Sequence, residues 1–180
     1  MSLVRHKALR RLLKTWKRRV QVLDDAINLD LGVEEVKLIR GNQIELPDWL
    51  IHVLEPGGYV SQYPLSIEEI SKYLYQEKQN ATVPASLVQI PWDFYVRARY
   101  TLRKLSSSQN QGDIENSKKL SQMVEDILRV RMRKIVQLAS LNVWDQTLIS
   151  KMTPEEILVF QDLRRSLDAI NGDKNGDSTT

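Results

Sequence analysis

The sequence predicts an α+β fold, in which a small β-rich domain is followed by a mainly α-helical bundle domain. Apolar residues tend to alternate with polar ones early in the chain, and later they recur mostly at intervals of three and four. The two patterns meet in residues 43–60, which read as a strand end, a proline corner, one short helix and a Gly-Gly stop. We therefore expect a basic leader over residues 1–17, the β-rich domain over 18–64, the helical domain over 65–171 and a disordered tail over 172–180.

Composition limits the number of domains and the kinds of site. With 180 residues and 42% hydrophobic content, the chain can bury one sizeable core and a small second one. It contains no cysteine, which excludes a disulfide framework, a thiolate metal site and a cysteine nucleophile. No run of apolar residues approaches the roughly 18 that a membrane-spanning helix needs. We therefore expect no membrane span.

The leader is strongly basic and has the spacing of an amphipathic helix. Residues 1–19 hold eight Lys or Arg and no acid, and the rest of the chain has 18 basic and 23 acidic residues, a net charge of −5. The apolar residues of this stretch recur at helical spacing. Three roles remain open: a solvated or partner-docking extension, contact with nucleic acid, and targeting to an organelle. The candidates for nucleic-acid contact are Arg10, Arg11, Lys14, Lys17 and Arg18.

Several short strands are predicted between residues 18 and 64. Residues 19–22 alternate, and residues 36–39 and 40–46 resemble two strands around a turn at Gly41-Asn42. Such a module holds too little apolar mass to be stable alone. We therefore expect this module to pack against the helical part or against another chain.

Start signals place the helices of the second domain. Ser66 and Glu69 form a capping box that predicts a helix over residues 66–79. A second helix should begin at Trp92 and present an apolar stripe from Tyr95 to Leu105. Asp113 can cap a long helix that ends near residue 140, with an apolar stripe of Leu120, Val124, Leu128, Met132, Ile135 and Ala139, and with Ile127 and Leu138 beside it.

The last helix has the strongest start signal. Thr153 can cap it, Pro154 fits its first position, and Glu156 can bond back to the cap. It should end near Asn171-Gly172.

No motif for catalysis, a cofactor or a metal is present. The two histidines, His6 and His52, have no nucleophile pattern around them, and adjacent acids such as Glu68-Glu69 and Glu155-Glu156 suit helix N-termini. A partial calcium-loop pattern after Asn171 lacks the glutamate that its twelfth position needs. We therefore expect neither an enzyme nor a bound cofactor or metal.

Two further segments carry clustered cations. Aromatic residues alternate with Arg97, Arg99, Arg103 and Lys104 in the stretch from Trp92, which is a pattern typical of non-specific phosphate binding. The long helix carries a second group, Arg129, Arg131, Arg133 and Lys134. The alternative, which we favour, is that both are solvated helix faces whose arginines pair with acids across a subunit interface.

Four features, in this order, resemble one known family. They are the short β-module, the turn from Leu46 to Leu50 into a helix that ends at Gly57-Gly58, the proline-broken region over residues 90–95, and a long arginine-bearing helix followed by residues 152–156. Over residues 18–170 the chain resembles a subunit of the GINS DNA replication complex. One subunit type of that family has its small β-domain before the helical domain. The order found here resembles that type, specifically the archaeal subunit related to the second and third eukaryotic ones.

The resemblance implies a non-enzymatic scaffold. Members of this family assemble through their helical domains into a four-subunit particle, and they bridge the hexameric MCM helicase to a RecJ-like protein at the replication fork. The implied partners are thus a second GINS subunit type in a hetero-tetramer, the MCM helicase and a RecJ-like companion, in a cytoplasmic, nucleoid-associated location. Weak DNA contact stays open. The alternative is a stand-alone basic nucleic-acid-binding adaptor, which the leader and the arginine-bearing segments favour.

The apolar faces of the predicted helices are the candidate interfaces. Obligate interfaces commonly bury more than about 2,000 Å² and are relatively apolar. Trp49 and Leu50 should be largely buried where the small domain meets its neighbours. The full set of candidates for an interdomain or subunit interface is Trp49, Leu50, Trp92, Tyr95, Leu102, Leu120, Val124, Leu128 and Ile135.

Overall fold

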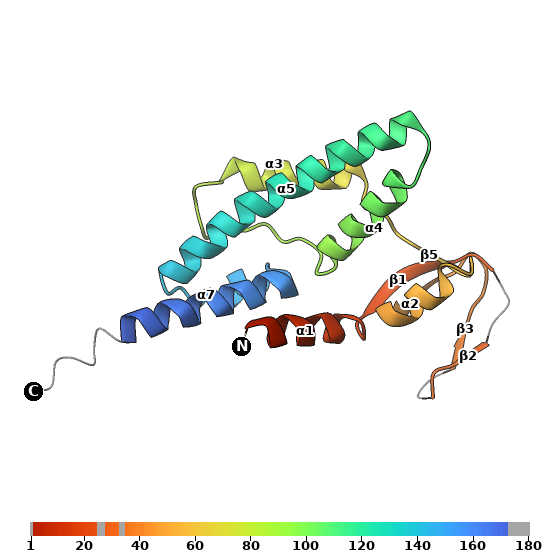
Figure 1. Ribbon diagram of the computed structural model, residues 1–180, viewed down its shortest axis with the longest axis horizontal. Coiled ribbons are helices and arrows are strands. Elements are labelled where there is room, and N and C mark those ends of the chain that lie inside the picture. Colours follow the sequence, from red (N-terminus) through yellow and green to blue (C-terminus); the bar gives the residue numbers. More distant parts are fainter. Residues whose placement is uncertain (1, 25–27, 33–34, 173–180) are drawn as a thin grey trace, which may run out of the picture. The chain divides into compact units, whose positions relative to one another are not determined.

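The computed structural model describes residues 2–24, 28–32 and 35–172, and these divide into two compact units (Figure 1). The small unit comprises Leu3–Pro64, and the helical unit begins at Leu65. The first carries the described strands and the second is built from helices. The predicted α+β class, with a small β region before a mainly helical one, is confirmed.

A three-stranded antiparallel sheet forms the centre of the small unit. Its strands are β1 (Lys17–Val22), β4 (Gln43–Pro47) and β5 (Val60–Gln62), and β1 lies between the other two. Alternation along β1 explains which side faces the core, because Arg18, Val20 and Val22 are buried and the residues between them are exposed.

The remaining strands correct the predicted hairpin around Gly41-Asn42. β3 (Glu35–Lys37) pairs with β2 (Asn28–Asp30), and β4 pairs with β1. The turn at Gly41 is bonded to the end of β1, since the Val22 N–H donates to Asn42 O over 2.9 Å and the Gly41 N–H donates to Val22 O over 2.9 Å. Gly41 has a φ of +85°, which a glycine adopts without strain. The turn therefore does not close a hairpin, because β4, the strand after it, pairs with β1 and not with β3.

Two helices complete the small unit. α1 (Ser2–Leu13) precedes the sheet, and α2 (Asp48–Leu54) follows β4. Leu50, Ile51 and Leu54 of α2 are buried in the core of the unit. The other buried members of that core are Val20, Val22, Leu38, Leu46 and Val60.

The helical unit is arranged around one long helix. α3 (Ile67–Gln79), α4 (Phe94–Ser106) and α7 (Pro154–Gly172) all pack against α5 (Gln111–Ser140), and α6 (Gln146–Ile149) is a single short turn (Figure 1). None of the described helices is long and apolar enough to cross a membrane.

The starts of α3 and α7 agree with the sequence, whereas α4 begins at Phe94, two residues after the predicted Trp92, and the start of α5 also differs. Ser66 Oγ accepts from the Glu69 N–H over 3.0 Å, and Thr153 and Glu156 cap α7 reciprocally over 2.9 and 3.4 Å. α5 begins two residues before Asp113 and is capped by Asn110, whose Oδ1 accepts from the Gly112 N–H over 3.0 Å. The short side chain of asparagine suits an N-cap as well as that of aspartate does.

The buried stripe of α5 contains Leu120, Ile135 and Ala139 of the predicted stripe but not Leu128. Leu128 is 42% exposed, whereas Leu120, Ile127 and Leu138 are buried. Successive steps of four residues each advance about 40° beyond a full turn, so a stripe extended from Leu120 by fours leaves the buried side after two steps. The buried positions of α5 are instead separated by three and four residues in turn.

Two apolar clusters fill the helical unit. One is centred on Phe94, Leu120 and Ile127, and the other on Ile135, Leu138 and Phe160. On α5, both Arg131 and Lys134 fall between Ile127 of the first cluster and Ile135 of the second. The buried charged side chains of α5 therefore lie between the two apolar clusters of the unit.

Candidate functional site

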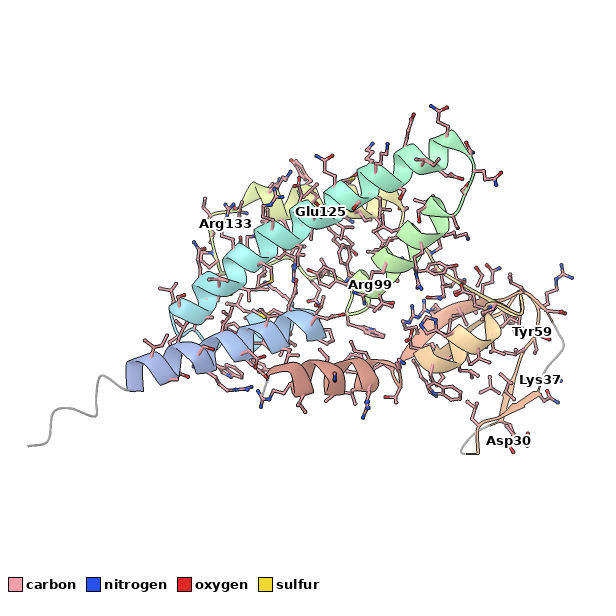
Figure 2. All side chains as sticks on the ribbon, in the orientation of Figure 1. Asp30, Lys37, Tyr59, Arg99, Glu125 and Arg133 are labelled. Atoms are coloured by element: carbon pink, nitrogen blue, oxygen red, sulfur yellow. The ribbon has the colours of Figure 1, made fainter. Side chains whose placement is uncertain are left out.

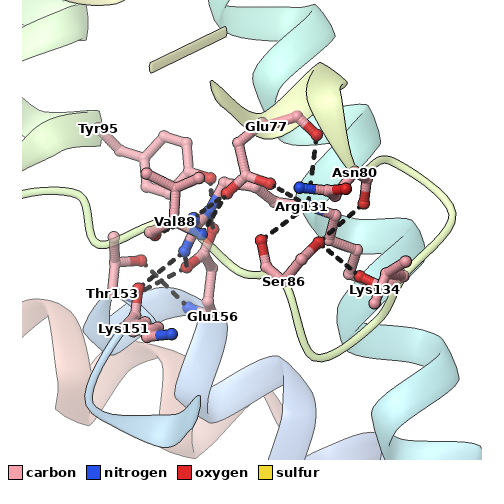
Figure 3. Close-up of polar contacts among 11 residues, drawn as sticks. Glu77, Asn80, Ser86, Val88, Tyr95, Arg131, Lys134, Lys151, Thr153 and Glu156 are labelled. Atoms are coloured by element: carbon pink, nitrogen blue, oxygen red, sulfur yellow. Dashed lines mark hydrogen bonds and ion pairs between the residues drawn. The ribbon is translucent and has the colours of Figure 1, made fainter. Parts of the chain in front are cut away.

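Arg131 is the centre of a buried ion-pair network in the helical unit (Figure 3). Its Nε and Nη2 donate to the two carboxylate oxygens of Glu156 over 2.7 and 2.8 Å. Nη1 donates to Glu77 Oε1 over 2.5 Å and to Val88 O over 2.7 Å, and Nη2 also donates to Lys151 O over 2.9 Å. All five N–H donors that a guanidinium carries therefore have acceptors.

Lys134 extends the network one helical turn along α5. Its Nζ donates to Glu77 Oε2 over 2.6 Å, to Ser86 O over 3.1 Å and to Glu77 O over 3.3 Å. The three donors of the ammonium group are thus used. The side chains of Arg131, Lys134 and Glu77 are 0% exposed.

Glu156 connects the network to the start of α7 and to α4. Beside Arg131, its carboxylate accepts from the Tyr95 hydroxyl over 2.7 Å and from the Thr153 N–H over 2.9 Å. Burial raises the pKa of Tyr95 far above its ordinary value, and the neighbouring Glu156 raises it further. Burial alone would lower the pKa of Arg131, but the bond to Glu156 and the charges of Glu156 and Glu77 outweigh burial and raise it. Tyr95 is therefore a neutral donor and Arg131 a permanent cation.

The network is charge-balanced and closed to solvent. Two cations face two carboxylates, and their side chains are at most 2% exposed. No face of it is open to a substrate or a nucleic acid, so its chemistry is limited to holding α3, α5, α7 and the segment 80–93 in one arrangement.

This geometry corrects the expectation for the cations of the long helix. Arg131 and Lys134 contact neither nucleic acid nor solvent, and they pair with acids of their own chain. Arg133, which lies between them, is exposed and points away (Figure 2). Sequence reasoning missed the network because cations were assigned to a solvated face. The available signal was their spacing, since positions 127, 131, 134 and 138 share one side of a helix.

A smaller buried network anchors the start of β1 in the small unit. Arg18 donates through Nη2 to Asp48 Oδ1 and through Nη1 to Gln62 Oε1 over 2.7 Å, and Gln62 Nε2 donates to Glu55 over 2.6 Å. Arg18 is only 4% exposed. Arg18 is therefore not available to nucleic acid, which corrects that candidate.

The candidate interface residues fall into three groups. Leu50, Leu120 and Ile135 are buried inside the cores of their own units, so they have little or no surface left for a partner. Trp49 and Leu128 are exposed. The half-buried remainder is Trp92, Tyr95, Leu102 and Val124.

Two shallow pockets and no metal cluster accompany these surfaces. One pocket of about 380 Å³ is lined by Ile90, Pro91 and Trp92 among others, and one of about 440 Å³ by Trp144, Arg164 and Arg165 among others. Within the described residues, no group of three His, Cys, Asp or Glu side chains is placed to hold a metal ion.

Comparison with known proteins identifies the helical unit. Residues 64–173, more than half of the chain, match the family model of the GINS complex protein helical bundle domain. The chain belongs to the GINS family. No curated protein matches the sequence. The match includes every member of the Arg131 network, and the GINS family consists of structural subunits of a replication complex. The small β region of this GINS chain precedes the matched domain.

Three exposed aliphatic side chains of α5 in the GINS helical bundle lie on one side of that helix. Ile114, Leu128 and Val136 are each more than 40% exposed. At 100° per residue these positions lie within an arc of about 80°. We call these three residues the α5 outer face.

In the small unit of this GINS chain, Trp49 and Leu50 differ in exposure. Trp49 is 46% exposed, whereas its neighbour Leu50 is 5% exposed. The reason is helical geometry, because α2 turns Leu50, Ile51 and Leu54 inward and leaves Trp49 and Val53, one turn apart, on the other side. Burial of Trp49 by another chain stays a prediction.

The leader cations of the GINS chain differ in their surroundings. Arg11, Lys14 and Lys17 are exposed, and Arg18 is buried. The side chain of Arg10 lies outside the described residues. The predicted tail, apart from Gly172 at the end of α7, also lies outside them.

Proposed function

We propose that this GINS family chain is a non-enzymatic structural subunit that assembles with a second GINS subunit type in a hetero-tetramer. In that complex it scaffolds the replicative helicase at the fork and bridges the MCM helicase to a RecJ-like partner. The observation that carries the proposal is the match of the whole helical unit to the GINS helical bundle domain. Its order of domains supports the archaeal subunit type with an N-terminal small domain, located at replication forks in the cytoplasm.

The α5 outer face supports assembly through the helical unit. A rigid helix that exposes large aliphatic side chains along one side is suited to packing against a helix of another subunit. The buried network contributes indirectly, because it fixes α5 against α3 and α7 and so presents the outer face in one geometry.

Substitutions on the α5 outer face test this route of assembly. Leu128→Glu combined with Val136→Glu should abolish co-elution with the second GINS subunit type in size-exclusion chromatography, because it places two charges in an apolar interface. The matched control is Ile170→Glu on α7, an exposed aliphatic position outside this face. Equal loss in the control, or retained assembly in the double variant, would contradict the assigned face.

The bridging role needs a separate experiment. The assembled GINS complex should retain both the MCM helicase and the RecJ-like protein on one affinity column, and neither partner should retain the other without it. Retention of the two partners in the absence of GINS would contradict a bridging function.

A stand-alone nucleic-acid-binding adaptor remains the second candidate, and the exposed leader cations Arg11 and Lys14 favour it. It predicts DNA affinity that falls steeply as salt is raised and that drops when residues 1–19 are deleted. The burial of Arg18 removes one of its five proposed contacts. The family match favours the assembly role over this one.

A further inference from the structure

The end of the leader is fastened to the start of α2. The Trp49 N–H donates to Lys14 O over 3.0 Å, and the Asp48 N–H donates to Trp16 O over 3.1 Å. Asp48 also holds Arg18 through the buried ion pair. The cationic turn at residues 14–16 and the first turn of α2 therefore form one rigid surface of the small unit.

That surface exposes large apolar side chains. Trp49 is 46% and Val53 is 66% exposed, and they lie one turn apart on the outer side of α2. Leu12, two residues before the fastened turn, is 53% exposed. We call Trp49, Val53 and Leu12 the leader–α2 patch.

Two exposed cations belong to the leader part of this surface. Arg11 and Lys14 are exposed, and among the described residues neither forms an ion pair. Of the acids that flank α2, Asp48 pairs with Arg18, Glu45 pairs with Arg19, and Glu55 accepts from Gln62. An uncompensated cationic rim around an apolar centre complements a partner that carries carboxylates around apolar anchors.

We propose that the leader–α2 patch is a docking site for an acidic amphipathic segment of a partner protein. The apolar side chains of that segment pack on Trp49 and Val53, and its carboxylates face Arg11 and Lys14. This site lies in the small unit, so it is a function additional to assembly through α5.

Other polyanions fit the patch less well. Duplex DNA binding is dominated by phosphate contacts, which give no role to the aliphatic Val53 and Leu12. An anionic membrane surface would favour apolar residues along one whole side of α1, but the exposed side chains of α1 include Lys7 and Arg11 beside Val4 and Leu12. An acidic protein segment uses both the apolar and the cationic groups.

The test uses the full chain and a fluorescein-labelled helical peptide of about fifteen residues that places leucines on one side and glutamates on the other. Fluorescence anisotropy should report saturable binding that weakens as salt is raised. Trp49→Ala should weaken it roughly tenfold or more, as expected for a central tryptophan. Lys14→Glu should weaken it several-fold, because it reverses one rim charge.

Matched controls lie in the helical unit. Trp144→Ala removes another exposed tryptophan, and Arg133→Glu reverses another exposed cation. Both should leave the peptide affinity unchanged. Val53→Ser serves as a second patch variant, since an exposed position tolerates it even if Trp49→Ala destabilises the unit.

Three results would overturn the proposal. The first is that the acidic peptide does not bind, or that a peptide with lysines in place of glutamates binds as well. The second is that the control variants weaken binding as much as the patch variants. The third is that a single-stranded oligonucleotide or a phosphatidylserine vesicle binds more tightly than the peptide in a Trp49-dependent manner, which would assign the patch to nucleic acid or to a membrane. Assembly with the second GINS subunit is unaffected by each of these results, so the two proposals fail separately.

Discussion

Arg131 illustrates what a single residue contributes to this protein. A charge removed from water is stabilised only if its partners are close and all of its donors are satisfied, and both conditions hold here. The sequence contains the helical spacing of Arg131 and Lys134, but their partners Glu77 and Glu156 are 54 and 25 residues away from Arg131. A pattern read along one helix has no information about such distant partners, and for that reason the two residues were assigned to the surface.

Removing Arg131 should strongly destabilise the helical unit. Arg131→Ala leaves the buried carboxylate of Glu156 without a cation and leaves Glu77 with Lys134 alone, so the free energy of unfolding should fall by about 3–5 kcal/mol. Urea unfolding followed by circular dichroism measures it. Arg133→Ala is the neighbouring control and should change stability by less than about 0.5 kcal/mol. Similar losses in both variants would contradict the network.

Tyr95 should make stability fall at high pH. Its pKa is raised in the folded chain, above the unfolded value of about 10. A group whose pKa is raised by folding stabilises the folded state fully below its unfolded pKa. This stabilisation is lost as pH rises above about 10. Urea unfolding at about pH 9 and pH 11 should therefore show a decrease in stability that is smaller in Tyr95→Phe. An identical decrease in the variant would exclude this tyrosine as a cause.

At the scale of elements, local signals predicted more than long-range pairing did. The starts of α3 and α7 follow from capping residues a few positions apart, and the structure confirms both. The partner of β4 could not be found in this way, because a turn at Gly41-Asn42 is compatible with a hairpin and with a return to β1. Only the bonds between Gly41, Asn42 and Val22 decide between the two.

The cap of α3 provides an element-scale prediction. Ser66→Ala removes the acceptor for the Glu69 N–H and should cost about 1 kcal/mol of unfolding free energy. Ser71→Ala is the control within the same helix, since its hydroxyl only bonds back to Ile67 O and alanine has the higher helix propensity. Thermal unfolding compares the two. An equal cost for both substitutions would show that the cap is not the cause.

At the scale of the whole molecule, the sequence indicated the fold class and the family, and much less about surfaces. The order of a small β region before a helical bundle and the GINS relationship are both confirmed. The candidate interface residues stay a prediction, because periodicity identifies an apolar side of a helix but does not say whether its own domain already covers that side. Leu120 and Trp49 show the two outcomes, the first buried in its own unit and the second exposed.

Because each unit has its own core, the helical unit should fold alone. A chain starting at Leu65 should give a helical circular dichroism spectrum and a single cooperative unfolding transition, with the effect of Arg131→Ala preserved. A fragment that lacks cooperative unfolding would contradict this division of the chain.

The central claim is that this chain functions as a subunit of a GINS assembly. Native mass spectrometry of the chain mixed with the second GINS subunit type tests it most directly, because the mass gives composition as well as association. We expect a hetero-tetramer that contains both subunit types. Free chain should be seen only when this chain is added in excess over the second subunit. A chain that stays monomeric in the presence of that subunit would contradict the claim.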